Sequence, residues 1–96
     1  MEDDNFVWDD DKAAANWSDH GVTFEMAREV FRDPFSVEWE DPGQNQSEER
    51  YSVIGMAEGR LLFVGYTMRD DKIRIITARK AEPYERRKYH EENREA

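Results

Sequence analysis

Two arginines lie in a segment that otherwise has the pattern of a buried strand. Residues 72–80 read Lys-Ile-Arg-Ile-Ile-Thr-Ala-Arg-Lys, so Arg74 is flanked by isoleucines and Arg79 comes near the end. A guanidinium keeps its charge, so it is seldom buried without an anionic partner. Its planar fork fits a carboxylate or a phosphate. The sheet is therefore built either around internal carboxylates or around an anion from outside.

The spacing of these arginines matters for any shared site. They are five residues apart, so on a regular strand they point to opposite faces unless a bulge intervenes. Arg74 is the first candidate for a phosphate clamp, with a structural ion pair as the alternative. Arg79 is a second candidate, and its alternative partners are Glu82, Glu85 or a carboxylate of the first helix.

Arg50 follows Glu49 at the start of another predicted strand. Adjacent strand residues face opposite sides of a sheet, so these two side chains are not partners in one site. Arg50 is a candidate phosphate contact. Glu49 is a candidate base, although exposed carboxylates are common on strands.

Three further residues each have a chemical and a structural interpretation. His20 ends a predicted helix, where it can cap carbonyl groups, but a histidine also titrates near neutral pH and can transfer protons. Lys12 lies eight residues earlier, on a similar face of that helix, and is either a site residue or a solvated lysine. Tyr89 can donate a proton to a leaving oxygen, or pack the last helix onto the sheet.

Length and composition indicate one small domain. The 96 residues include no cysteine, which excludes a disulfide framework and a thiolate metal site. The longest apolar run, residues 61–66, is too short to span a membrane, and the acidic start does not resemble a signal peptide. We expect a single domain over residues 1–96, frayed at 1–4 and about 92–96, in the cytoplasm and without a metal or cofactor.

Charge is unevenly distributed along the chain. The net charge is −9, which taken alone argues against nucleic-acid binding. Residues 1–59 hold 4 basic and 16 acidic residues, whereas residues 60–88 hold 9 basic and 4 acidic residues. The C-terminal half is therefore basic. Either its function requires this charge, or the charge is the ordinary scatter of charged residues over a protein surface.

Patterning predicts a strand, two helices, a run of strands and a last helix. The predicted elements are a strand at 5–8, helices at 12–20 and between Thr23 and Asp33, strands at 35–40, 49–56, 60–68 and 72–79, and a helix at 83–92. Two-residue turns at 58–59 and 70–71 make the connections hairpins. We therefore predict an α+β fold with two N-terminal helices packed on a twisted antiparallel sheet, and one mostly charged C-terminal helix lying loosely on the rest.

An ordered set of short segments over residues 5–90 resembles the BrnT family of bacterial toxins. The segments are Phe6-Val7-Trp8-Asp9, Lys12-Ala13 with Asn16, His20-Gly21-Val22-Thr23-Phe24, Val30-Phe31, Asp33-Pro34, Glu49-Arg50-Tyr51, Ile54-Gly55, Arg60-Leu61-Leu62, residues 73–81, Glu85-Arg86 and Tyr89. Thr77 stands where the family usually has serine, which keeps a hydroxyl group there.

The resemblance implies a RelE-like fold and a ribonuclease that blocks translation. It also implies a BrnA-like antitoxin partner with a ribbon-helix-helix DNA-binding part, so that DNA is contacted only through the antitoxin. RNA can be cut without a metal when its own 2′-hydroxyl attacks the adjacent phosphate, which requires charge neutralisation and two proton transfers. The candidate catalytic residues are Arg74, Arg50, Arg79, Glu49, His20 and Tyr89. The candidate RNA contacts are Lys12, Lys72, Lys80 and Arg86.

Two functions fit these observations. The first is a metal-independent endoribonuclease toxin that is neutralised by its antitoxin. The second is a weak or inactive homologue that holds an antitoxin through an acidic surface with Glu38, Glu40 and Asp41. Convergence of two of the three strand arginines on one open groove would favour the first, and pairing of all three with internal carboxylates would favour the second.

Overall fold

Tight turns fold the second half of the chain into three long antiparallel strands. In the computed structural model, which describes residues 1–41 and 49–94, these strands are β3 (Arg50–Ala57), β4 (Arg60–Arg69) and β5 (Lys72–Lys80). Glu58, Gly59, Asp70 and Asp71 all have positive φ, as tight hairpin turns require. Both predicted hairpins are confirmed.

Two short strands complete a five-stranded sheet, in the order β1-β5-β4-β3-β2. Strand β2 (Val37–Asp41) pairs antiparallel with β3, but β1 (Phe6–Val7) pairs parallel with β5. The prediction of an antiparallel sheet is therefore wrong at this edge. No hairpin links β1 to β5, since most of the chain separates them, so no tight turn dictates their direction.

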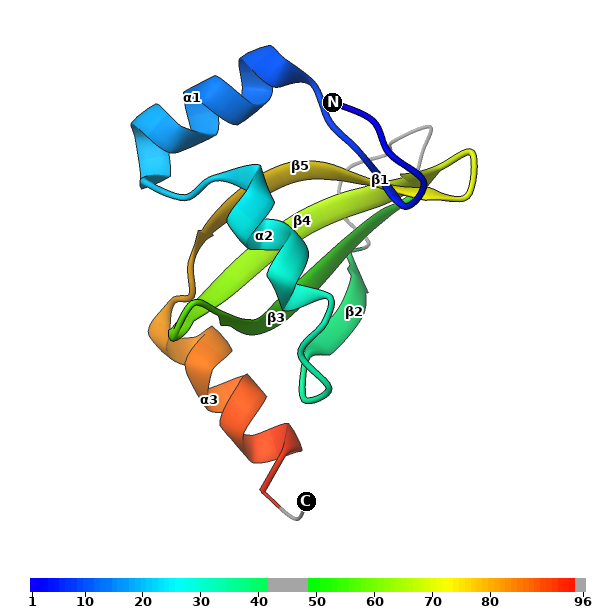
Figure 1. Ribbon diagram of the computed structural model, residues 1–96. Helices are drawn as coiled ribbons and strands as arrows, with labels where there is room; N and C mark the ends of the chain where they lie inside the picture. The colour runs from blue at the N-terminus through cyan, green and yellow to red at the C-terminus, as the bar shows by residue number, and fades with distance from the viewer. Residues whose placement is uncertain (42–48, 95–96) are drawn as a thin grey trace.

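Helices α1 (Asp10–His20) and α2 (Phe24–Val30) cover one face of the sheet (Figure 1). Asp9 caps α1 by accepting hydrogen bonds from the backbone N–H groups of Asp11 and Lys12, and Thr23 caps α2. The main core lies beneath them and contains Trp8, Val22, Phe24, Ala27, Val30, Val53, Ala57, Leu62, Val64, Tyr66, Ile75 and Ala78. The α+β class with three helices is confirmed.

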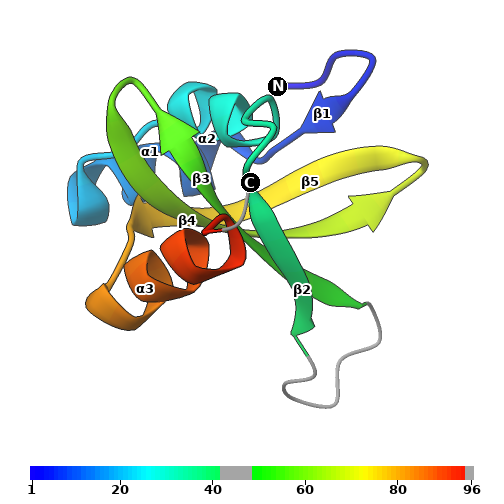
Figure 2. The ribbon, with the colours of Figure 1, turned by 90° about the horizontal axis from the view of Figure 1, so that it is seen from below.

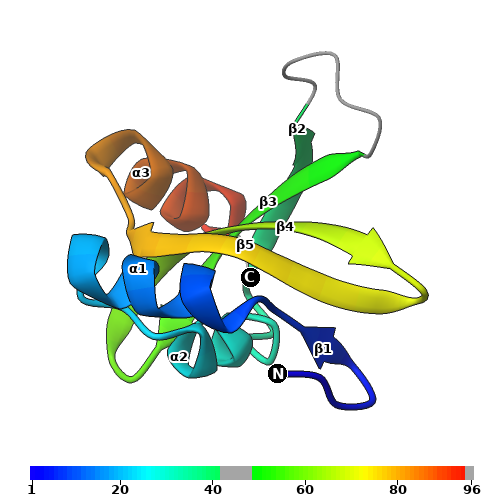
Figure 3. The same cartoon turned by 90° about the horizontal axis from the view of Figure 1, so that it is seen from above.

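Helix α3 (Pro83–Glu92) lies on the opposite face, so the sheet is the middle layer (Figures 2 and 3). It is not loosely attached, contrary to the prediction. Glu85 and Tyr89 are both buried, and Tyr89 packs with Ile54, Leu61 and Ala81 in a second core cluster. Residues four apart share a helix face, so two side chains are enough to anchor a helix whose other faces are charged.

The N-terminal residues, which the sequence predicts to fray, contact the body of the protein. Glu2 lies 2.6 Å from the Lys72 ammonium, and Asp3 pairs with Arg28 at 3.1 Å.

Among the described residues, no helix has the length and apolar character needed to cross a membrane.

Candidate active site

A bulge in β5 places Arg74 and Arg79 on the same face of the sheet. Gly65 pairs with Thr77 and the next residue, Tyr66, pairs with Ile75, so Ile76 is an extra residue in β5. The alternation of faces therefore shifts by one between the two arginines. The expectation of opposite faces, which assumes a regular strand, is wrong here. Both side chains project on the face that carries α3.

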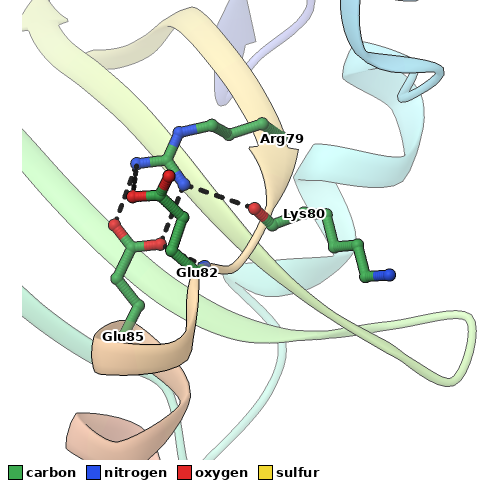
Figure 4. Close-up of polar contacts among 4 residues, drawn as sticks. All are labelled: Arg79, Lys80, Glu82 and Glu85. Atoms are coloured by element: carbon green, nitrogen blue, oxygen red, sulfur yellow. Dashed lines mark hydrogen bonds and ion pairs between the residues drawn. The ribbon is translucent and has the colours of Figure 1, made fainter.

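Arg79 is held in a structural ion pair. Its two terminal nitrogens donate to the two carboxylate oxygens of Glu85, each at 2.9 Å (Figure 4). Its guanidinium also lies 4.1 Å from the centre of the Phe63 ring. Burial would raise the pKa of the Glu85 carboxyl, but hydrogen bonds from Arg79 and from the Glu82 backbone outweigh burial and hold that pKa below its ordinary value. Arg79 is thus neutralised by one of the acids proposed for it.

Arg50 and Arg74 instead lie in a row across three strands. Thr67 pairs with Arg74, and Arg50 lies one residue beyond the Tyr51–Tyr66 pair, opposite Thr67. Two strand spacings separate the α carbons of the arginines by about 10 Å. Neither guanidinium forms an ion pair with any residue in 1–41 or 49–94, and the Nε of Arg50 is buried without a hydrogen-bond partner. We call this pair the arginine row.

A small hollow adjoins the arginine row. Its volume is about 110 Å³, and its lining includes Arg50, Asp41, Ser52, Gly65 and Thr77. Small and hydroxyl-bearing residues leave this part of the sheet open, whereas α3 covers the other end of the same face. A β carbon on Gly65 would lie 3.0 Å from the Thr77 methyl group and would narrow the hollow. Sequence reasoning missed Gly65, although a glycine inside a strand is a signal for close approach of a ligand.

The remaining catalytic candidates lie elsewhere. Glu49 accepts a hydrogen bond from the Tyr51 hydroxyl at 2.7 Å, and Tyr51 faces away from Arg50. His20 is exposed in the last turn of α1. Tyr89 donates to Asp33 at 2.7 Å, and burial together with this hydrogen bond raises the Tyr89 pKa to about 12. The structure therefore does not bring these three side chains to the arginine row.

The predicted RNA contacts divide between the two ends of the sheet. Lys12 lies in the first turn of α1, close to Asp9, whose pKa is lowered by the backbone N–H groups of Lys12 and Asp11 and by the positive charges of Lys12 and Arg74. Lys72 is already paired with Glu2. Lys80 and Arg86 line a second hollow at the opposite end of β5.

No group of three or more histidine, aspartate or glutamate side chains within residues 1–41 and 49–94 is arranged to hold a metal ion. What the arrangement offers is positive charge: two guanidinium groups on one open face, with hydroxyl groups and one carboxylate beside them.

One comparison with known proteins gives a match. A family model described as the ribonuclease toxin BrnT of type II toxin-antitoxin systems matches residues 8–85, which is most of the chain. No curated protein matches the sequence.

Proposed function

This chain belongs to the BrnT family of ribonuclease toxins of type II toxin-antitoxin systems, and on that premise we propose that it is a metal-independent endoribonuclease whose arginine row binds the phosphate that is cleaved. The proposal includes a RelE-like fold, action in the cytoplasm, and a block of translation through RNA cleavage. The observation that carries it is that Arg50 and Arg74 lie on one face of the sheet, that Arg50 lines the hollow, and that neither arginine forms an ion pair with a residue in 1–41 or 49–94.

The reaction needs stabilisation of developing negative charge. When the 2′-hydroxyl attacks the neighbouring phosphorus, a new P–O2′ bond forms, the P–O5′ bond breaks, and extra charge collects on the non-bridging oxygens. Two guanidinium forks on one face can donate several hydrogen bonds to those oxygens. Because Arg50 has a buried, unpartnered Nε, an anion that enters the hollow would supply a hydrogen-bond partner that the described residues do not.

Two protons must also move. The 2′-hydroxyl loses one, and the departing 5′-oxygen gains one. Asp41 lines the hollow and pairs across the strands with Arg50, so its carboxylate is our candidate base. Thr77 lines the same hollow, while its hydroxyl group donates a hydrogen bond to the Asn16 side-chain oxygen at 3.4 Å.

Cleavage by the purified protein tests this function. The antitoxin-free protein should cut single-stranded RNA in the presence of EDTA and leave 2′,3′-cyclic phosphate ends. Substitution Arg74→Ala should lower kcat by roughly a hundredfold or more, the scale seen when a group that stabilises transition-state charge is removed, and Arg50→Ala should act in the same direction. Arg32→Ala, which removes one charge outside the hollow, is the control. Intact RNA with a demonstrably folded protein would refute the proposal.

The family also implies an antitoxin protein as partner, and we propose a BrnA-like antitoxin with a ribbon-helix-helix DNA-binding part.

A second candidate function, that of an antitoxin-binding module without strong catalysis, is favoured by the acidic edge of the sheet. There β2 is an edge strand, and a hollow of about 370 Å³ is lined by Glu38, Trp39, Glu40, Tyr51, Tyr66 and Met68. Growth arrest on expression, relieved by the antitoxin, separates a toxin from an inactive binder.

A further inference from the structure

Within the described part of the chain, four basic side chains and no acidic one line a hollow at the end of the sheet that is farther from the arginine row. The hollow has a volume of about 350 Å³ and lies among the β3–β4 turn, the end of β5 and α3. It is lined by Met56, Gly59, Arg60, Leu61, Lys80, Arg86 and His90. We call it the basic hollow. In a chain of net charge −9, four cationic or titratable basic groups around one concavity call for an explanation.

Local acids do not neutralise these groups. None of the four forms an ion pair with another residue in 1–41 or 49–94, and the polar side-chain contact of Arg60 is a 3.7 Å approach to the Met26 sulfur. The nearby acids Glu82 and Glu85 face Arg79 instead. Figure 4 shows the Lys80 ammonium pointing away from that acidic pair. No acid within residues 1–41 or 49–94 therefore forms an ion pair with the basic groups that line the hollow.

We propose that the basic hollow binds a backbone phosphate of the RNA substrate, at a distance from the bond that is cut. This inference rests on the proposed ribonuclease function and deepens it. Guanidinium forks and an ammonium group arranged around one concavity suit a phosphate, whose oxygens accept several hydrogen bonds at once. The apolar floor, formed by Met56 and Leu61, gives a sugar or base a surface against which to pack.

The two sites are far enough apart to hold different phosphates. Lys80 follows Arg74 by six residues on β5, which corresponds to about 20 Å along the strand. A dinucleoside monophosphate has one phosphate and can fill only one site, whereas a longer strand can fill both. Arg86 and His90 also lie beyond residues 8–85, which the family model matches.

Substrate length provides the test. The double variant Lys80→Gln/Arg86→Gln removes two charges from the basic hollow. The control Arg32→Gln/Arg87→Gln removes two charges elsewhere, one of them from the neighbouring position on α3. Cleavage of a short single-stranded RNA and of dinucleoside monophosphates is measured for both. Binding of the same RNA is measured by fluorescence anisotropy against salt concentration, in an Arg74→Ala background that slows cleavage.

We expect the hollow variant to raise KM for the longer RNA, with kcat unchanged, and to cleave dinucleoside monophosphates at the wild-type rate. Its plot of log affinity against log salt should be shallower by about 0.7, because the single-strand phosphate that the hollow no longer neutralises contributes about 0.7 to the slope. The control variant should retain the wild-type KM and slope. Melting temperatures of both variants confirm that folding is intact.

Two results would overturn the inference. One is an RNA affinity and salt slope of the hollow variant equal to those of the control. The other is unchanged RNA binding with weakened antitoxin binding, which would make the hollow a protein-binding surface. Failure of the wild-type protein to cut any RNA would instead refute the proposed function, while the anisotropy measurement would still report on the hollow.

Discussion

At the scale of single residues, three strand arginines on one face have two different roles. Arg79 forms an ion pair with Glu85. Neither Arg50 nor Arg74 forms an ion pair with a residue in 1–41 or 49–94, and the Arg50 Nε has no hydrogen-bond partner there. The difference between them comes from α3, which places Glu85 beside Arg79 at one end of the face and leaves the other end of that face uncovered. Buried acids therefore decide which guanidinium is structural and which can meet a ligand.

Glu85→Gln tests the structural role of Arg79. Glu85 has 0% side-chain exposure and Arg79 has 26%, so loss of the carboxylate leaves a partly buried guanidinium poorly paired. We expect the free energy of unfolding at pH 7 to fall by about 2 kcal/mol. Chemical denaturation measures the change. Glu82→Gln is the control, because Glu82 is 58% exposed and lies 3.9 Å from Arg79.

The same variant has a defined pH dependence. The pKa of Glu85 is lower in the folded protein than its ordinary value of 4.5, so its stabilising effect is fully present above that value and is lost as the pH falls through the folded pKa. The difference between wild type and Glu85→Gln should therefore shrink below about pH 4.5. A difference that stays constant down to acid unfolding would show that the ion pair is not its cause.

At the scale of elements, the sequence predicts most of the fold but not the features that build the site. Hairpin turns and alternating patterns locate β3, β4 and β5, because their signals are local. The parallel pairing of β1 with β5 depends on contacts between residues that are far apart in the sequence. The bulge at Ile76 has no local marker either, since isoleucine suits any buried strand position. One extra residue thus converts two arginines on opposite faces into two on the same face.

Gly55→Ala tests how closely α2 packs on β3, and Gly65→Ala tests the hollow on the opposite face of the sheet. A β carbon on Gly55 would lie 2.8 Å from a Val30 methyl group and 3.0 Å from the Val30 carbonyl oxygen, so α2 would have to move away from β3. We expect Gly55→Ala to lower the free energy of unfolding by about 1–3 kcal/mol, while its folded fraction still cleaves RNA.

Gly65→Ala should show the reverse pattern. Its new methyl group would meet the methyl group of Thr77, a side-chain rather than a backbone atom, at 3.0 Å and would enter the hollow beside Arg50. We expect near wild-type thermal stability and a reduced kcat/KM for RNA. Equal stability of both variants would show that α2 does not press on β3. Undiminished cleavage by Gly65→Ala would show that the hollow is not where the phosphate reacts.

At the scale of the whole molecule, acidic and basic side chains are gathered on separate surfaces, which suits the two proposed partners of opposite charge. The acidic edge holds Glu38 and Glu40, and the open face and the basic hollow hold the arginines and lysines. A net charge of −9 is thereby compatible with the proposed RNA cleavage, because local clusters of charge determine contacts. The acidic surplus also suits electrostatic steering of a basic antitoxin segment.

Glu40→Lys is the sharpest test of that acidic edge. Glu38 accepts a hydrogen bond from the Tyr66 hydroxyl and Asp41 lines the hollow of the arginine row, so changing either would disturb more than charge. Glu40 is exposed and pairs across the strands with Tyr51, beside the hollow lined by Met68. We expect the association rate with antitoxin to fall by roughly threefold to tenfold at low salt, with the difference fading as salt is raised.

Glu25→Lys, on α2, makes the same change in net charge at a site outside that hollow and is the matched control. Stopped-flow mixing with purified antitoxin measures both rates, and RNA cleavage without antitoxin should be unchanged in each variant. If Glu40→Lys and Glu25→Lys slow association equally, overall charge rather than this edge steers the partner. If neither slows it, the antitoxin approaches through another surface, and the acidic edge of β2 serves only to protect an unpaired strand from joining other sheets.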